Sequence, residues 1–283
     1  MRSSKLLAFS IALGLVAPFS IAQAQKAKPA AAAPAVSGDQ VKAGLAALDA
    51  KKYPEAVNAF NAAFNAGQAD GAFYLGRMVE LGVGLQADAE KARVLYLAAA
   101  DKGSAKAMNR VGLMHFRGEG VLQDYKAAAD MICKAADLGD SDAQYNCAGL
   151  YAEGRGVAKD IAKAVPYYKK AADAGHIGAL NSLGFLYANG ADGVPADLKQ
   201  AEGYFEKAAN RGNPVALFEL ARMYEAGEPV SKDLLKAHMY YNLAAARQLP
   251  AASVALERVS SQLSPADVEK AQAAAKAWKV EGQ

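Results

Sequence analysis

The side chains best able to carry out chemistry in this chain are three histidines and two cysteines. The histidines are His115, His176 and His238, and no two of them have the four-residue spacing that lets two histidines of one helix share a metal ion. No serine lies in a Gly-x-Ser-x-Gly nucleophile elbow. Gly-x-Gly strings recur, but they lack the full spacing and the preceding strand of a phosphate-binding loop. The sequence therefore predicts no metal site, no cofactor, no catalytic residue and no enzymatic activity.

The N-terminus has the layout of a secretory signal peptide over residues 1–24. Basic residues precede a 12-residue apolar stretch, 6–17, and an A-x-A motif ends at Ala24, after which we expect cleavage. The stretch is shorter than the roughly 20 residues of a membrane span, although an uncleaved anchor is the alternative. Residues 25–38 are rich in Ala and Pro and predict a linker. We therefore expect a periplasmic or secreted protein without stable membrane insertion.

The remaining composition fits a helical protein with a sizeable core. The formal net charge of +3 falls to +1 when the two basic residues of the signal peptide are removed, which gives no support for nucleic-acid binding. Much of the 53% hydrophobic content is Ala, and small side chains suit helices that pack closely.

A shift of about 36 residues aligns the chain with itself, and such a period indicates a repeat architecture. A small residue recurs in five units: Gly76, Gly112, Ala148, Gly184 and Ala221. A glycine follows six positions later: Gly82, Gly118, Gly154, Gly190 and Gly227. An aspartate then follows: Asp88, Asp124, Asp160, Asp197 and Asp233.

Each unit predicts two helices. Small and apolar residues at helical spacing indicate the first helix, of which 143–152 is an example. The glycine ends this helix in the left-handed conformation, and the aspartate opens the second helix as its N-cap. The fourth unit has one extra loop residue, and Pro166 falls inside a second helix, where we expect a kink.

The third unit, AQYNCAGLYAEGRGVAKDIAKAVPYYKKAADAG, is the most complete copy of this pattern, which resembles the Sel1-like repeat, a relative of the tetratricopeptide repeat. The resemblance implies an all-α fold, a right-handed αα-superhelical solenoid of stacked helix pairs. It covers five units, 70–105, 106–141, 142–177, 178–214 and 215–248, between a tetratricopeptide-like pair in 39–69 and capping helices in 249–283.

Cys133 and Cys147 leave two interpretations open. They stand at similar distances from a predicted turn at Gly139, on helices that we expect to be antiparallel, and export to an oxidising space favours a disulfide between them. Cysteine-rich relatives join the same two helices, but nearer the turn. The alternative is a buried thiol at Cys147 and a lone thiol at Cys133.

Related tetratricopeptide solenoids line their inner groove with first helices, and this register implies concave-face candidates in the present chain. The candidates are Phe73, Arg77, Glu80, Asn109, Leu113, Phe116, Tyr145, Asn181, Phe185, Phe218, Arg222 and Glu225. Asn side chains can donate to and accept from a peptide backbone, and aromatic rings supply contact area. The alternative is that several of these residues only pack between helices or lie on the surface.

The resemblance implies an exported scaffold or adaptor of a bacterial-type cell envelope that binds a protein or peptide through its concave face. A glycan or cell-wall-associated scaffold is the first alternative, since aromatic residues serve sugars too. A β-lactam-binding or β-lactam-hydrolysing enzyme is the second, but this chain lacks the cysteine pattern of those relatives.

Overall fold

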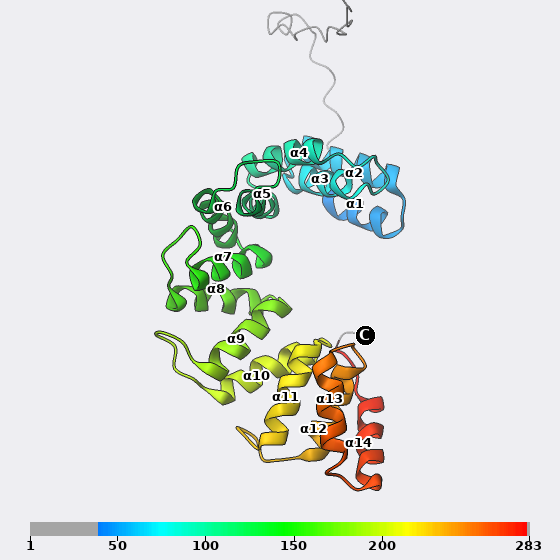
Figure 1. The fold of residues 1–283 in the computed structure, drawn as a ribbon. Coiled ribbons are helices and arrows are strands. Elements are labelled where there is room, and N and C mark those ends of the chain that lie inside the picture. The colour runs from blue at the N-terminus through cyan, green and yellow to red at the C-terminus, as the bar shows by residue number, and fades with distance from the viewer. Residues whose placement is uncertain (1–38, 282–283) are drawn as a thin grey trace, which may run out of the picture. The chain divides into compact units, whose positions relative to one another are not determined.

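The computed structural model describes residues 39–281, which form an all-α array of helix pairs (Figure 1). The helices before the middle of the chain are α1 (Gln40–Asp49), α2 (Tyr53–Asn65), α3 (Asp70–Leu81), α4 (Ala89–Asp101), α5 (Ala105–Arg117), α6 (Tyr125–Asp137) and α7 (Ser141–Glu153). The helices after it are α8 (Ile161–Asp173), α9 (Ile177–Asn189), α10 (Leu198–Ala209), α11 (Pro214–Ala226), α12 (Leu234–Ala245), α13 (Pro250–Ser260) and α14 (Pro265–Ala277). The predicted all-α fold is confirmed.

The five repeated aspartates cap the second helices, as predicted. In α8, for example, Oδ1 of Asp160 accepts the backbone N–H of Lys163 at 2.9 Å. The glycines that end α3, α5, α7 and α11 are left-handed, but Gly190 at the end of α9 has φ 69° and ψ 169°. The prediction of a left-handed cap is therefore wrong there, because the longer fourth loop leaves α9 in another direction and pairs Ala191 with Val194.

Close approach between the two helices of a unit depends on the small repeated residue. A Cβ atom on Gly184 would lie 2.5 Å from the ring of Phe205, and one on Gly112 would lie 2.5 Å from Ile132. Phe205 and Ile132 are each 1% exposed, so they fill the space that the missing side chains leave. The glycines thus set the distance between the helices of their pairs.

Contacts run mainly between neighbours in chain order. Among α1, α3, α5 and α7, each first helix also contacts the first helix of the next pair. In Figure 1, α3 and α5 accordingly lie on the inner side of a curved row, and α4 and α6 lie on its outer side. The candidate site lies on the surface that the first helices form. The right-handed twist of the row stays a prediction.

The two ends of the row are covered by additional helices. At the N-terminal end α2 packs on α3, and at the C-terminal end α14 packs on α12. Ser264 caps α14 by accepting the N–H of Asp267, and the Trp278 ring lies under the Arg247 guanidinium at 5.1 Å. Helix α8 continues through Pro166, and its kink stays a prediction.

The predicted signal peptide and linker, residues 1–38, lie outside the described residues. Within 39–281, no helix combines the length and the apolar character needed to cross a membrane.

Candidate functional site

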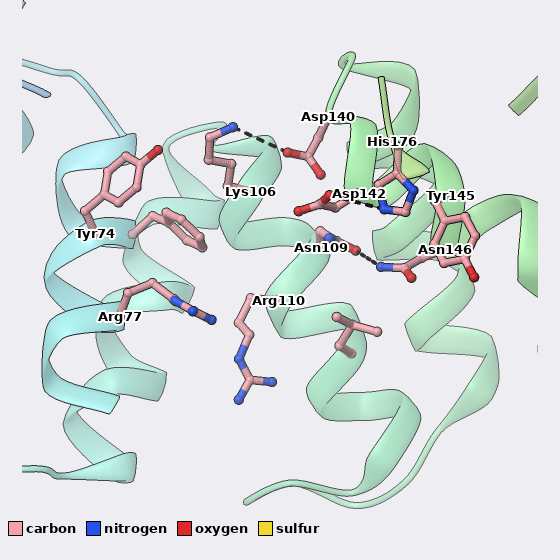
Figure 2. Close-up of a pocket in the computed structure, with 12 residues that line it drawn as sticks. Tyr74, Arg77, Lys106, Asn109, Arg110, Asp140, Asp142, Tyr145, Asn146 and His176 are labelled. Atoms are coloured by element: carbon pink, nitrogen blue, oxygen red, sulfur yellow. Dashed lines mark hydrogen bonds and ion pairs between the residues drawn. The ribbon is translucent and has the colours of Figure 1, made fainter. Parts of the chain in front are cut away.

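Helices α3, α5 and α7 form the walls of a groove of about 550 Å³ on their shared face, which we call the first-helix groove (Figure 2). Its lining residues are Phe73, Tyr74, Arg77, Lys106, Asn109, Arg110, Leu113, Asp140, Asp142, Tyr145, Asn146 and His176. The lining combines aromatic, amide, cationic and anionic side chains from three successive first helices and from the start of α9.

The groove brings together five of the residues that the sequence singled out, namely Phe73, Arg77, Asn109, Leu113 and Tyr145. Phe116 lines an adjoining hollow that also contains Leu113 and Tyr145. Glu80 faces a separate hollow beside α4.

The candidates on α9 and α11 lie farther along the row and do not line the groove: Asn181, Phe185, Phe218, Arg222 and Glu225. Most of these side chains have partners within the protein. Asn181 donates to Asn213 at 3.1 Å, Arg222 pairs with Glu219 at 2.9 Å, and Glu225 accepts from Tyr241 at 2.7 Å.

Seven residues that line the groove were missed by sequence reasoning: Tyr74, Lys106, Arg110, Asp140, Asp142, Asn146 and His176. Tyr74, Arg110 and Asn146 each follow directly after a predicted candidate. A prediction that included the next residue of each first helix would have contained them. Asp140 and His176 are N-caps of α7 and α9, in the turns between repeats, where the first-helix register names no candidate.

An amide pair lies at the centre of the groove. The side-chain amide of Asn146 donates to Oδ1 of Asn109 at 3.0 Å, across the contact between α5 and α7. Asn109 is 7% exposed, so the bond holds its side chain in one orientation. The accessible amide of Asn146 retains donor and acceptor capacity that a backbone could use.

The upper end of the groove in Figure 2 is rich in carboxylates. Lys106 lies 3.5 Å from Asp140. His176 stacks on Tyr145 at 4.4 Å, and its Nδ1 accepts the N–H of Ala179 as the cap of α9. This bond requires the ring proton on Nε2, which lies 3.5 Å from Asp142. The cap bond and the stacking on Tyr145 hold the His176 ring beside Asp142.

The lower end is rich in guanidinium groups. Arg110 forms ion pairs with Glu80 and Glu119, and Arg77 lies 3.8 Å from the same Glu80. Desolvation raises the pKa of Glu80, but hydrogen bonds from Arg110 and Tyr96 outweigh it and hold the pKa below its ordinary value. Glu80 and Glu119 thus face three guanidinium groups, since Arg117 lies 3.2 Å from Glu119.

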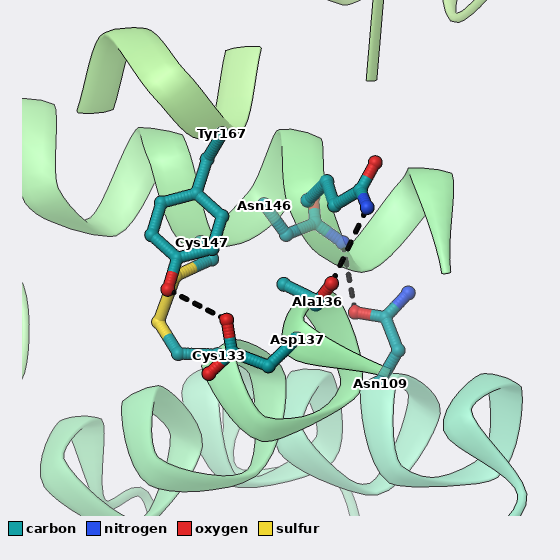
Figure 3. The surroundings of a disulfide bond; sticks show 8 residues. Asn109, Cys133, Ala136, Asp137, Asn146, Cys147 and Tyr167 are labelled. Carbon is teal, nitrogen blue, oxygen red and sulfur yellow. Dashed lines mark hydrogen bonds between the residues drawn. A yellow bond between two sulfur atoms is a disulfide. The ribbon is translucent and has the colours of Figure 1, made fainter. Parts of the chain in front are cut away.

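A disulfide joins Cys133 of α6 to Cys147 of α7, with Cα atoms 5.0 Å apart, so the interpretation with free thiols is wrong (Figure 3). Beside it, the Tyr167 hydroxyl donates to Asp137 at 2.9 Å. Burial and the Asp137 carboxylate raise the pKa of Tyr167 to about 12. The disulfide fastens the second repeat to the third, whose first helices are two of the groove walls.

Within residues 39–281, no cluster of three potential metal ligands occurs. His238 is 1% exposed on α12, and burial lowers its pKa. The histidines contribute helix capping and packing in this part of the chain.

The Sel1 repeat family model matches five segments of the sequence: 69–104, 105–140, 141–176, 177–213 and 214–249. These segments cover more than half of the chain, which therefore belongs to the Sel1 repeat family. The predicted repeat frame differs by one residue at each unit's start, because a repeat has no unique first residue. No curated protein matches the sequence.

Two solved structures share the fold. A Sel1 repeat protein from Oxalobacter formigenes has a TM-score of 0.69 and 26% identity, over 87% of this chain and 99% of its own. A protective antigen of uropathogenic Escherichia coli strains, with 24% identity and a TM-score of 0.69 over 84% of this chain, supports the fold alone. The present chain spans about half of that antigen, 52% of its length. Sel1 repeat proteins generally mediate protein–protein interaction, and scaffolds of this family are generally not enzymes.

Proposed function

We propose that this protein is an exported scaffold that binds an extended segment of a partner protein in the first-helix groove, within a bacterial-type cell envelope. The observation that carries the proposal is the Asn109–Asn146 pair at the centre of a groove with aromatic walls and charges at both ends. Amides satisfy the polar groups of a peptide backbone, while rings such as Tyr145 supply buried contact area.

The dimensions of the groove favour an extended peptide. Neighbouring helices pack about 9 Å apart, so crossing from α3 to α7 covers about 18 Å. An extended chain covers that distance with about five or six residues at roughly 3.3 Å each. A segment of this length contacts all three walls at once, which suits the continuous arrangement of the lining.

Export is supported by the signal-like sequence of residues 1–24 and by the Cys133–Cys147 disulfide, since disulfides persist mainly in oxidising compartments. Both features favour the periplasm or the extracellular space.

Affinity capture from an envelope extract, followed by mass spectrometry, tests the proposal. The bait is the purified protein, and the test variant is Arg77→Ala with Asn146→Ala, two changes in the groove. The matched control is Arg222→Ala with Ser182→Ala, at the equivalent repeat positions on α11 and α9.

We expect a protein that the wild type and the control retain and the groove variant loses. Equal recovery by all three baits would contradict binding in the groove. Retention of material that survives protease treatment of the extract would favour a glycan instead. We expect no turnover of a chromogenic β-lactam, and turnover that a groove substitution abolishes would contradict the scaffold function.

A further inference from the structure

We infer that the first-helix groove selects a segment carrying a basic and an acidic residue about six positions apart, the basic residue at Asp142 and the acidic residue at Arg77. The inference rests on the proposed function and adds the chemistry and the orientation of the partner. It depends on an imbalance of charge at each end of the groove.

At the upper end, carboxylates outnumber cations. Asp140 and Asp70 both lie close enough to Lys106 to act on it: desolvation lowers the pKa of Lys106, but Asp140, Tyr74 and Asp70 together outweigh desolvation and raise it. One ammonium group therefore already faces two carboxylates. Asp142 adds a third, and its nearest partner is the Nε2 of His176, at 3.5 Å.

Asp142 is also the most accessible of the charged groups at this end. Its side chain is 72% exposed, against 7% for Asp140, which is held as the cap of α7. A basic side chain of a ligand can therefore reach Asp142 without displacing an internal ion pair. An acidic side chain placed there would meet uncompensated negative charge.

At the lower end the imbalance is reversed. Three arginines share two carboxylates there. Arg110 pairs with both Glu80 and Glu119, and Arg117 pairs with Glu119. Arg77 lies beside Glu80, which also accepts from the Tyr96 hydroxyl. The 3.8 Å separation between Arg77 and Glu80 exceeds hydrogen-bond length, and the Arg77 side chain is 47% exposed. Its guanidinium can therefore bind a carboxylate in the two-pronged geometry that arginine favours.

The helical register sets the distance between the two ends. Arg77 stands seven residues beyond Asp70, which is the repeat counterpart of Asp142. Seven residues correspond to about 10 Å along the helix axis, and two helix spacings add about 18 Å across it. The diagonal is about 20 Å, which an extended peptide covers with about six residues.

In Figure 2 the Asn109–Asn146 pair lies at a height between these ends, on the Asp142 side of the groove. A ligand lying along the diagonal therefore passes its backbone over the amides while its charged side chains reach Asp142 and Arg77. A segment with two like charges at this spacing would match one end and be repelled at the other.

Selection from a displayed library of random dodecapeptides tests the inference. We expect the wild type to enrich peptides with one basic and one acidic residue five to seven positions apart. Arg77→Glu should enrich peptides in which the acidic residue is replaced by a basic one, and Asp142→Lys should replace the basic residue by an acidic one. A synthetic peptide enriched by the wild type should bind that protein at least about tenfold more tightly than the same peptide with both charges reversed.

Two substitutions outside the groove serve as controls. Arg222→Glu changes the repeat counterpart of Arg77 on α11, and Asp130→Lys changes an exposed acid of α6, 67% exposed. Both should enrich the wild-type pattern. If a charge reversal lowers helicity, the milder Arg77→Gln and Asp142→Asn should relax the preference at one end only.

The outcomes separate the two proposals. The inference would be overturned if the enriched peptides compete for the groove but show no charge pattern, or show the same pattern with every variant. Binding in the groove would then still stand. Recovery of no groove-dependent peptide from the library would overturn both.

Discussion

Substituting Gly184 by Ala tests whether contact between the two helices of a repeat, and not helix propensity, decides stability at the repeated small position. The new Cβ would lie 2.5 Å from Phe205, closer than carbon atoms approach in folded proteins. The Phe205 ring is 1% exposed and has Phe185 beside it, with ring centroids 5.2 Å apart. The ring therefore cannot move aside without disturbing α9 or α10.

Two opposing effects set the size of the change. Replacing Gly by Ala inside a helix stabilises it by about 0.5–1 kcal/mol. Adding a methyl group to a filled core costs about 1–3 kcal/mol. Overpacking should win, and Gly184→Ala should destabilise the protein by about 1 kcal/mol.

Gly203 provides a matched control in the same repeat. It lies inside α10, and a Cβ there would meet nothing within 4 Å. Gly203→Ala should therefore stabilise the protein by about 0.5–1 kcal/mol, so that the two variants lie about 2 kcal/mol apart. Urea unfolding followed by far-ultraviolet circular dichroism measures both. A Gly184→Ala protein as stable as Gly203→Ala would refute the packing argument.

Four further outcomes are expected. Asp160→Ala should cost about 1 kcal/mol in thermal unfolding through loss of the α8 cap, and an unchanged melting temperature would contradict that role. Leu183→Ala, which truncates a fully buried side chain, should cost about 2–5 kcal/mol in urea unfolding, and a cost below 1 kcal/mol would reject the proposed register. Reducing Cys133–Cys147 should remove about 3 kcal/mol, seen as a lower urea midpoint with reductant than without. The pKa of Glu80 is lower in the folded protein than the ordinary carboxyl pKa near 4.5, so the ionised Glu80 stabilises the fold above pH 4.5. This stability is lost as the pH falls through the pKa of Glu80 in the folded protein. Glu80→Gln should therefore flatten this part of the stability–pH curve.

The fold could be predicted because its determinants are local and periodic. An aspartate such as Asp160 satisfies backbone N–H groups within its own helix, so its role follows from its neighbours in the sequence. At Gly190 the local pattern predicts the wrong backbone conformation. The glycine keeps its place in the pattern, but the extra residue after it changes the path of the chain, which one-dimensional spacing does not describe.

The candidate site could be predicted only along one line of residues. Asn109 was found because its position in the first helix repeats, whereas Asn146 was missed although it bonds to Asn109 across the groove. Glu225 was predicted as a binding residue, but Tyr241 and Arg258, 16 and 33 residues away in the sequence, occupy its carboxylate in the structure. Pairings of this kind depend on how neighbouring repeats pack, and a repeat pattern alone does not determine them.

The predominance of contacts between neighbours in chain order has a consequence for how such a protein can change over evolution. The first-helix groove needs only α3 to α7 and the start of α9. A duplicated or deleted copy of the α11–α12 unit would alter the length of the array while leaving every wall of the groove in place. The length of the array and its ligand preference can therefore evolve separately. The length changes with the number of units, and the ligand preference changes through point substitutions at residues such as Arg77 and Asp142.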